Sequence, residues 1–373
     1  MKNEAKNKIL LLAGVFLGVL ALVAPAAALA GDVIVVETTI QAAVDSASPG
    51  DTIVVPPGVY KESVLVTTSG LTIQGSHGAI IDAEGFENGI TVAGGAITPG
   101  PGGFPICPTP GIDGFTVQGL TVKNADENGV FVIGVNNYHI TGGKYIDNEE
   151  YGIFPICSTN GLIDFNQVEG TEDAGIYVGD DDTVLVTKNH VTRCTIGIEV
   201  ENTLNADVIN NKAIGNTTGI LVVVLPGLPI PKTENVKIVN NVVNKNNFPN
   251  PVPPPGPGGG EAEGALPTGT GILNVGGDNV LIKDNVVNGN DSLGVAIIAN
   301  PFAVFDPRIE PFPDNNRVES NVILQNGSSP DPLRATTPGA DIVYDASGTG
   351  NCFTGNIFMV DFPAGITGFF PCP

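Results

Sequence analysis

Apolar and polar residues alternate in short segments that recur at a fixed interval along most of this chain. A Gly followed by Ile or Val marks each repeat, and successive marked Gly residues are 22 or 23 residues apart from Gly129 to Gly219. Within the repeats, stretches such as residues 175–178 and 279–283 alternate in the manner of a half-buried strand. Short strands at a constant period near 22 residues predict an all-β parallel solenoid, in which each coil pairs with the next.

Two segments interrupt this period. The interval that follows Gly219 lengthens to 52 residues, and the interval that follows Gly89 lengthens to 40 residues. The extra residues fall near 94–111 and 226–267, which are rich in Pro and Gly. Pro has no backbone N–H to donate, so these segments cannot form continuous strands of a sheet. We therefore predict roughly eleven coils with two extruded loops.

Repeated Asn residues and the two chain ends complete the predicted solenoid. A column of stacked Asn side chains in the αL conformation is expected at one turn; its members are Asn189, Asn211, Asn241, Asn285 and Asn321. Residues 38–47 have helical apolar spacing after Thr39, a candidate N-cap, so a short helix is expected to cap the first coil. A Phe cluster is expected to close the other end; it comprises Phe353, Phe358, Phe362, Phe369 and Phe370.

The sequence also resembles known proteins. Residues 40–60, which contain Pro49-Gly50-Asp51, resemble the opening of many right-handed parallel β-helix proteins of the pectate-lyase-like superfamily. Residues 173–179, 197–202 and 219–229 are similar to a narrower family of exported bacterial β-helix repeat proteins without a settled activity. The resemblance implies a right-handed β-helix over essentially the whole mature chain. It implies no reaction, because this fold carries many unrelated functions.

The first thirty residues have the pattern of a secretory signal peptide. Three Lys residues precede an apolar run over residues 9–23, and Ala28-Leu29-Ala30 provides a cleavage site. A run of about 15 apolar residues is short for a bilayer span, so no membrane span is expected after cleavage. We expect export to the periplasm or the extracellular space, and one mature domain over residues 31–373.

Export allows disulfide bonds between the five cysteines. Cys107 and Cys157 each end a Phe-Pro-Ile-Cys tetrapeptide, whereas Cys352 and Cys372 flank the C-terminal segment. We predict these two pairs and a free Cys194, although spacing alone leaves other pairings open.

The chain is strongly acidic, with 39 acidic against 16 basic residues and a net charge of −23. This charge disfavours nucleic acid and anionic membranes as partners and favours cations. Alignment of the coils by their marked Gly stacks two columns of carboxylates, namely Asp126, Glu127, Glu149, Glu150, Glu172 and Asp173. Hard oxygen ligands suit Ca²⁺, so the columns are a candidate calcium site; the alternative is a solvated acidic turn.

A third column is predicted on the outward side of the same strands. Phe131, Phe154 and Tyr177 lie two residues after their marked Gly, and Glu199 takes this position on the next coil. Aromatic rings beside carboxylates suit the apolar faces of sugar rings, so these four residues are candidate substrate-binding residues. The alternative is an aromatic stack covered by the loop at 94–111.

Candidate catalytic groups are few. A polysaccharide lyase needs a base and a cation for the substrate carboxylate, and Arg193, near Glu172 and Asp173, is the candidate base. A surface ion pair is the alternative interpretation of Arg193. A hydrolase needs two carboxylates about 5 to 10 Å apart, which the columns offer in many combinations. Uronan epimerases of the superfamily carry Asp-Pro-His after a Tyr-Gly-Ile-like lead, but here Tyr151-Gly152-Ile153 continues as Phe-Pro-Ile, so that chemistry is not transferred.

These patterns favour an exported β-helix scaffold that binds polysaccharide along one acidic, aromatic face, with Ca²⁺ as a candidate ligand. A polysaccharide lyase or a hydrolase that uses the same face is the first alternative. An accessory factor of an exported metalloenzyme is the second. The oligomeric state does not follow from the sequence.

Overall fold

The computed structural model describes residues 31–100, 105–109, 111–256 and 262–373, and residues 31–373 form one compact unit. The predicted signal peptide lies outside the described residues. Within the described part of the chain, no helix is long and apolar enough to cross a membrane.

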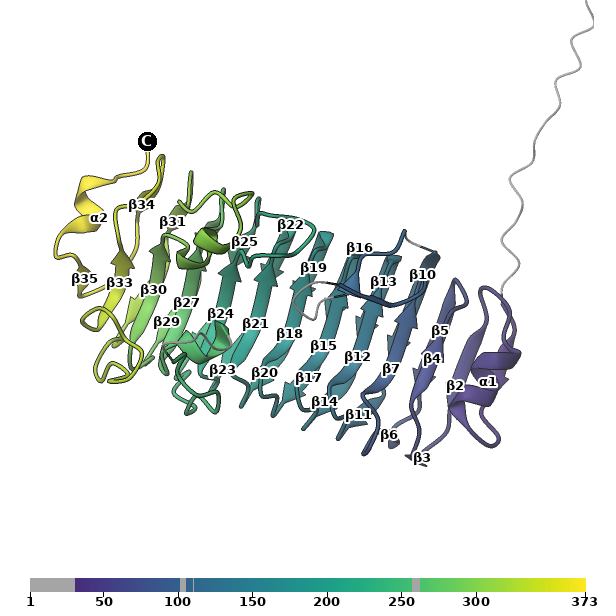
Figure 1. Cartoon of the computed structure of the whole chain (residues 1–373). Helices are drawn as coiled ribbons and strands as arrows, with labels where there is room; N and C mark the ends of the chain where they lie inside the picture. Colours follow the sequence, from purple (N-terminus) through teal and green to yellow (C-terminus); the bar gives the residue numbers. More distant parts are fainter. Residues whose placement is uncertain (1–30, 101–104, 110, 257–261) are drawn as a thin grey trace, which may run out of the picture. The chain divides into compact units, whose positions relative to one another are not determined.

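Three parallel sheets form a β-helix, which confirms the predicted fold, and successive strands of each sheet follow one another along the chain (Figure 1). Sheet A contains twelve strands: β1 (Val33–Val35), β2 (Thr52–Val55), β5 (Leu71–Gly75), β10 (Ile112–Gln118), β13 (Val135–Thr141), β16 (Thr159–Asp164), β19 (Asp182–Thr187), β22 (Leu204–Ile209), β25 (Lys237–Val239), β28 (Leu281–Lys283), β31 (Arg317–Glu319) and β34 (Cys352–Thr354). Sheet B contains ten strands: β3 (Gly58–Tyr60), β6 (Ala79–Asp82), β11 (Thr121–Lys123), β14 (Lys144–Ile146), β17 (Gln167–Glu169), β20 (His190–Thr192), β23 (Lys212–Ile214), β26 (Val242–Asn244), β29 (Val286–Asn288) and β32 (Val322–Leu324). Sheet C contains eleven strands: β4 (Val64–Val66), β7 (Asn88–Ala93), β12 (Asn128–Ile133), β15 (Tyr151–Ile156), β18 (Ala174–Gly179), β21 (Ile196–Glu201), β24 (Thr218–Val223), β27 (Thr270–Val275), β30 (Leu293–Ile298), β33 (Ala340–Tyr344) and β35 (Asp361–Phe362).

Aliphatic side chains fill the interior of the solenoid in columns. On sheet C, Ile153, Ile176 and Ile198 are in register on adjacent strands and are fully buried. Branched side chains pack well on such a pleated surface, which explains why Ile and Val follow the marked Gly residues.

A ladder of Asn side chains runs along the turn between sheets A and B. Each ladder Asn donates both its backbone N–H and its side-chain amide to Oδ1 of the next, for example Asn211 to Asn241 and Asn241 to Asn285, at 2.8–3.2 Å. The predicted column is therefore confirmed, but the predicted αL conformation is wrong for its members. The αL residue is the one before the ladder Asn, such as Asn210 and Asn240, because the turn reverses there and leaves the ladder side chain directed inward.

Both ends of the solenoid are covered. The capping helix α1 (Ile40–Ser46) begins after Thr39, whose side chain accepts a 3.1 Å hydrogen bond from the Ala42 amide, as predicted. At the other end, next to α2 (Ile366–Phe369), Phe353 is buried and Phe370 packs against the core. Phe369 is instead exposed, so the predicted cluster closes this end only in part.

Described residues of both predicted loops pack against the outer face of sheet C, where Cys107 and Leu266 join the buried side chains. The first carries the short antiparallel pair β8 (Thr98–Pro99) and β9 (Pro105–Ile106). The predicted second loop, 226–267, is wrong in its bounds, because β25 and β26 lie inside it and complete a regular coil. Its extra residues are divided between a segment before β25 and a segment after β26 that contains the 3₁₀ helix η2 (Ala262–Ala265). A further irregular segment, which includes η3 (Pro301–Phe305), separates β30 from β31 and was not predicted.

Candidate functional site

The predicted aromatic column exists on the outer face of sheet C, but it is not an open surface. Phe131 pairs in register with Phe154, and Tyr177 pairs in register with Glu199. The rings are in contact, with centroids 5.3 Å apart for Phe131 and Phe154 and 4.7 Å apart for Phe154 and Tyr177. All four side chains are buried, Tyr177 completely, so the expectation of an exposed stripe is wrong. The alternative, a covered stack, is what the structure contains.

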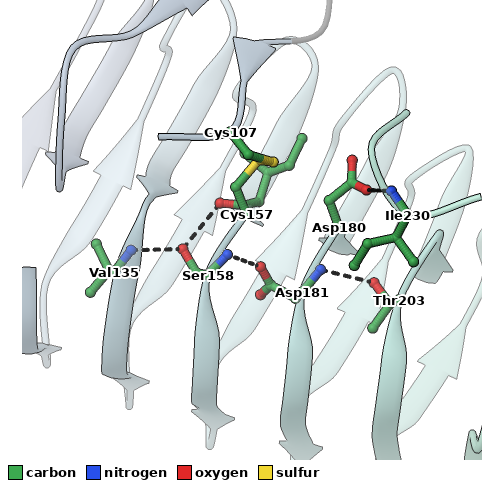
Figure 2. The surroundings of a disulfide bond; sticks show 9 residues. Cys107, Val135, Cys157, Ser158, Asp180, Asp181, Thr203 and Ile230 are labelled. Atoms are coloured by element: carbon green, nitrogen blue, oxygen red, sulfur yellow. Dashed lines mark hydrogen bonds between the residues drawn. A yellow bond between two sulfur atoms is a disulfide. The ribbon is translucent and has the colours of Figure 1, made fainter. Parts of the chain in front are cut away.

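A disulfide bond fastens the first loop over this stack. Cys107 is bonded to Cys157, at the end of β15, and packs against the buried cluster that contains Phe131 and Phe154 (Figure 2). The second predicted disulfide, Cys352–Cys372, is also present, and Cys194 is free and buried. Both predicted pairings are therefore confirmed.

A hydrogen bond fastens the segment before β25 over the neighbouring coils. The Ile230 backbone N–H donates to Oδ1 of Asp180 at 2.7 Å (Figure 2). The Asn202 amide also donates to the Ile230 carbonyl at 2.6 Å and to the Leu225 carbonyl at 3.0 Å. These bonds explain why residues on the outer face of sheet C are buried at this point.

Beneath these segments lies a group of acidic and phenolic side chains that we call the acid–tyrosine cluster; its members are Tyr151, Asp173, Tyr177, Asp180, Glu199 and Glu201. Glu199 and Glu201 are two residues apart on strand β21, so both side chains lie on its outer face. Each is only 2% exposed. The rings of Tyr151 and Tyr177 are 5.3 Å apart in an edge-on arrangement. Three adjacent strands of sheet C, β15, β18 and β21, thus carry the centre of the cluster.

Burial and mutual repulsion perturb the carboxyl groups of the cluster. Burial, followed by the charges of Glu201, Asp173 and Glu263, raises the pKa of Glu199 well above its ordinary value. Burial also raises the pKa of Glu201, with further increases from Asp173, Glu263 and Asp180. Burial raises the pKa of Asp180 to about 7, although the Ile230 amide and the Arg308 charge act in the opposite direction. Burial and the repulsion between the two groups both disfavour ionisation of Glu199 and Glu201 together.

Several polar atoms of the cluster have no well-formed hydrogen bond. They include the Tyr177 hydroxyl, Oε1 of Glu201 and Oδ2 of Asp180, all buried. Tyr177 lies close enough to Glu201 to lower the pKa of that carboxyl slightly, but the contact lacks good hydrogen-bond geometry. Buried polar atoms are normally satisfied, so unsatisfied ones grouped at one place indicate a site for water or a ligand.

Glu127, Glu150 and Asp173 follow one of the two predicted columns in their backbone, since Glu150 N–H donates to the Glu127 carbonyl and Asp173 N–H to the Glu150 carbonyl, at 2.9 and 3.2 Å. The side chains of Asp126, Glu149, Glu150 and Glu172 are exposed, whereas Glu127 and Asp173 are partly buried. Within the described ranges, which include all six, no group of three or more Asp, Glu, His or Cys side chains is arranged to hold a metal ion. Calcium binding by these columns stays a prediction.

Arg193 is engaged elsewhere on the surface. Its Nε donates to Oε1 of Glu169 at 2.7 Å, and its Nη2 lies 3.4 Å from Oδ1 of Asp147. Asp147 directly follows strand β14 and Glu169 is the last residue of strand β17, so both partners lie where strands of sheet B end. The Arg193 side chain is about half exposed. A guanidinium held in two ion pairs is a poor base, so the alternative interpretation, a surface ion pair, fits the structure better than the predicted catalytic role.

Sequence reasoning therefore found part of this cluster and missed the rest. Glu199, Tyr177 and Asp173 were predicted as site residues, although for different roles. Glu201 was missed, and yet the alternation in β21 places it on the same face as Glu199. Tyr151 lies in the Tyr-Gly-Ile-Phe segment, and its burial beside the carboxyl groups depends on the loops that cover sheet C, which the sequence pattern does not place. Chemically, the cluster can hold and move one proton next to a small buried space.

Solved structures with the same fold have low sequence identity to this chain. The A-module of a mannuronan C-5 epimerase from Azotobacter vinelandii has a TM-score of 0.54 at 15% identity, over 88% of this chain and 95% of that module. A DFA-IIIase from Arthrobacter chlorophenolicus A6, in complex with GF2, has a TM-score of 0.50 at 16% identity, over 84% and 86% of the two chains. The Dettilon tailspike protein has a TM-score of 0.52 at 13% identity, over 87% and 66%. No curated protein sequence matches this chain significantly.

At these identities the structural likeness concerns the fold alone. The sequence profile of the right-handed β-helix region matches residues 59–225 and 106–302, which together cover more than half of the chain. The three parallel sheets agree with this match and confirm the predicted resemblance to right-handed β-helix proteins of the pectate-lyase-like superfamily. The chain therefore belongs to the right-handed β-helix family.

Proposed function

We propose that this protein is a carbohydrate-active enzyme that cleaves a glycosidic bond at the acid–tyrosine cluster. The observation that carries the proposal is the buried pair Glu199 and Glu201, which project from one strand into a site with unsatisfied polar atoms. Perturbed carboxyl groups in an enclosed site are a recognised sign of acid–base catalysis. The proposal replaces a binding stripe of exposed aromatic rings, because those rings are buried.

Hydrolysis of a glycoside requires one protonated and one ionised carboxyl group. Glu199 borders an adjoining cavity and is assigned the role of general acid, which donates its proton to the leaving oxygen as the glycosidic C–O bond breaks. Water adds to the anomeric carbon, and its proton passes to ionised Glu201, whose side chain must turn away from Glu199 to admit that water, because the two carboxyl groups lie close together here. The hydroxyl of Tyr177, which has no well-formed hydrogen bond, is available to a sugar hydroxyl or to this water.

A neutral sugar suits the cluster better than a uronic acid. The charges that contribute most to the pKa values of Glu199 and Glu201 are those of other carboxylates, and these would repel a uronate. The charge of Arg308 lowers the pKa of Asp180, but the guanidinium itself forms an ion pair with Asp306 and is not available to a substrate. These charges favour a hydrolase over the lyase that acts on polyuronates.

The similar structures include a mannuronan C-5 epimerase, which is named for action on a polysaccharide. Their low identity transfers no residue roles to this chain. They support only the general choice of a carbohydrate as substrate class, and the cluster itself supports the choice of reaction.

The test is a screen of neutral oligosaccharides and alkyl and aryl glycosides, with mass spectrometry to detect cleavage. Glu199→Gln and Glu201→Gln should each reduce turnover about 10²- to 10⁴-fold while the thermal midpoint stays the same or rises. Glu84→Gln, an exposed carboxylate on a coil outside the cluster, is the control and should keep full activity. Turnover that survives both substitutions in the cluster would contradict the proposal, and cleavage confined to uronans with an unsaturated product would favour the lyase.

A further inference from the structure

A cavity of about 260 Å³ lies on the outer face of sheet C, directly beside Glu199. Strands β21, β24, β27 and β30 form its floor. Its roof consists of η2 with the residues that follow it, the start of η3, and residues 334–337. The cavity and the acid–tyrosine cluster therefore adjoin on neighbouring coils and share one carboxyl group.

Aliphatic side chains form most of the cavity wall. Leu221, Leu273 and Leu293 lie on the floor, and Leu266 and Phe302 belong to the roof. The four Leu side chains are each less than a tenth exposed, although the cavity itself is partly open to solvent. Apolar cavities of about 150 Å³ remain dry and bind benzene, and this larger one has room for roughly ten carbon atoms in proportion.

The charged groups at the cavity are not arranged to receive an anion. Glu263 lies at its border and would repel a carboxylate or a phosphate, and Glu199, protonated as the proposed general acid, offers no positive charge to attract one. Arg334, which also lines it, donates to the Gly264 carbonyl at 2.9 Å and to the Val252 carbonyl at 2.7 Å. Its remaining contact is an ion pair with Asp331, so this guanidinium serves to hold the roof in place.

We propose that this cavity binds an uncharged apolar group of about ten carbon atoms, and that this group is the aglycone of the glycoside cleaved at Glu199. The first half depends on the cavity alone, whereas the second half rests on the proposed function. A substrate of this kind is amphiphilic: its sugar faces the carboxyl pair, and its aliphatic or aromatic part occupies the cavity. Release of an apolar leaving group would then follow directly from protonation by Glu199.

The first experiment is a calorimetric binding series with 1-alkanols from hexanol to dodecanol. Each added methylene should strengthen binding about fourfold until the cavity is filled near ten carbons, after which affinity should stop rising. Decanoate at pH 8 should bind at least tenfold more weakly than 1-decanol, because Glu263 repels it and the aliphatic wall leaves its charge without a partner. An absence of alkanol binding, or equal binding of decanoate, would overturn the cavity assignment.

Variants locate the binding within the fold. Ala296 lines the cavity and is 1% exposed, so the Phe side chain of Ala296→Phe should fill the space and lower the affinity for 1-decanol at least tenfold. Val286→Phe, on the exposed surface of β29 in the same coil, is the matched control and should bind normally. Leu273→Ala enlarges the cavity and should move the plateau to longer alkanols, which a folding defect in the Phe variant would not imitate.

Activity measurements separate the two halves of the inference. If glycosides are cleaved at a rate that depends neither on the length of the alkyl group nor on the Ala296→Phe substitution, the aglycone assignment is wrong and the proposed function stands. If alkanols bind with the expected length dependence but no glycoside is cleaved, the cavity assignment stands and the proposed function fails. If both hold, kcat/KM for alkyl glycosides should rise with chain length up to the same plateau.

Discussion

The hydroxyl of Tyr138 donates a 2.7 Å hydrogen bond to Oδ2 of Asp181 in the interior of the solenoid, where both side chains are almost fully buried. The Ser158 backbone N–H donates to the other oxygen of Asp181 (Figure 2). Burial outweighs these bonds and raises the pKa of Asp181 to about 7. The neighbouring Asp180 faces the covering segment at Ile230, so two consecutive carboxyl groups serve opposite sides of the same turn.

Asp181→Asn should make the protein less sensitive to rising pH. The folded-state pKa of about 7 exceeds the ordinary value of 3.8, so the stability that protonated Asp181 contributes is complete below about pH 4 and is lost as pH rises through 7. At 1.4 kcal/mol per pKa unit this loss is about 4 kcal/mol at most. Urea unfolding between pH 4 and 8 should show a smaller decline for the variant than for the wild type. Glu172→Gln, an exposed control, should follow the wild-type curve, and a parallel decline in Asp181→Asn would contradict the prediction.

Two Tyr to Phe substitutions should differ in their cost. Tyr138→Phe removes the hydroxyl that donates to Asp181 and should lower the free energy of unfolding by about 1–3 kcal/mol, because it leaves a buried acceptor unsatisfied. Tyr177→Phe removes a hydroxyl without a well-formed hydrogen bond and should be neutral or slightly stabilising. Both phenols are fully buried, so burial is matched and equilibrium unfolding in urea compares the two directly. Equal losses would mean that the Tyr177 hydroxyl has a partner in solution.

The repeat allowed most of the fold to be predicted, because residues separated by one repeat length become neighbours on adjacent parallel strands. The spacing from Gly129 to Gly175 correctly placed Phe131 beside Phe154 and Glu127 beside Glu150. Irregular segments have no such constraint, which is why the second loop was given wrong bounds around β25 and β26.

The candidate site was harder to predict, because its properties depend on what covers sheet C. Alternation placed Phe154 and Glu199 on the outer face but could not show that loops remove both from solvent. The ion pairs of Arg193 depend on where sheet B ends, two coils away from Asp147. Periodicity therefore specified which residues are neighbours, whereas burial, and with it the pKa shifts, required the three-dimensional path of the loops.

A single break in the Asn ladder should be costly. Asn241 accepts from the backbone and side chain of Asn211 and donates to Asn285 and to the Val208 carbonyl. Asn241→Ala leaves buried donors and acceptors without partners, so we expect a loss of about 3 kcal/mol or more in urea unfolding. Asn240→Gly, at the exposed αL position next to it, should cost little, since Gly adopts positive φ readily. Similar losses for the two variants would show that the turn conformation, not the ladder, stabilises this edge.

The disulfide between Cys107 and Cys157 should protect the acid–tyrosine cluster as well as stabilise the fold. Replacement of both cysteines by Ser should lower stability by about 2–5 kcal/mol and free the loop that covers Phe131 and Phe154. Water would then reach the neighbouring carboxyl groups, so the raised pKa values of Glu199 and Glu201 should move toward the ordinary value in a carboxyl ¹³C NMR titration. The control is the double Ser variant of Cys352 and Cys372, at the C-terminal end of the solenoid, which should lose stability without altering that titration. Unchanged pKa values in the first variant would show that the segment at Ile230 excludes water from the pair by itself.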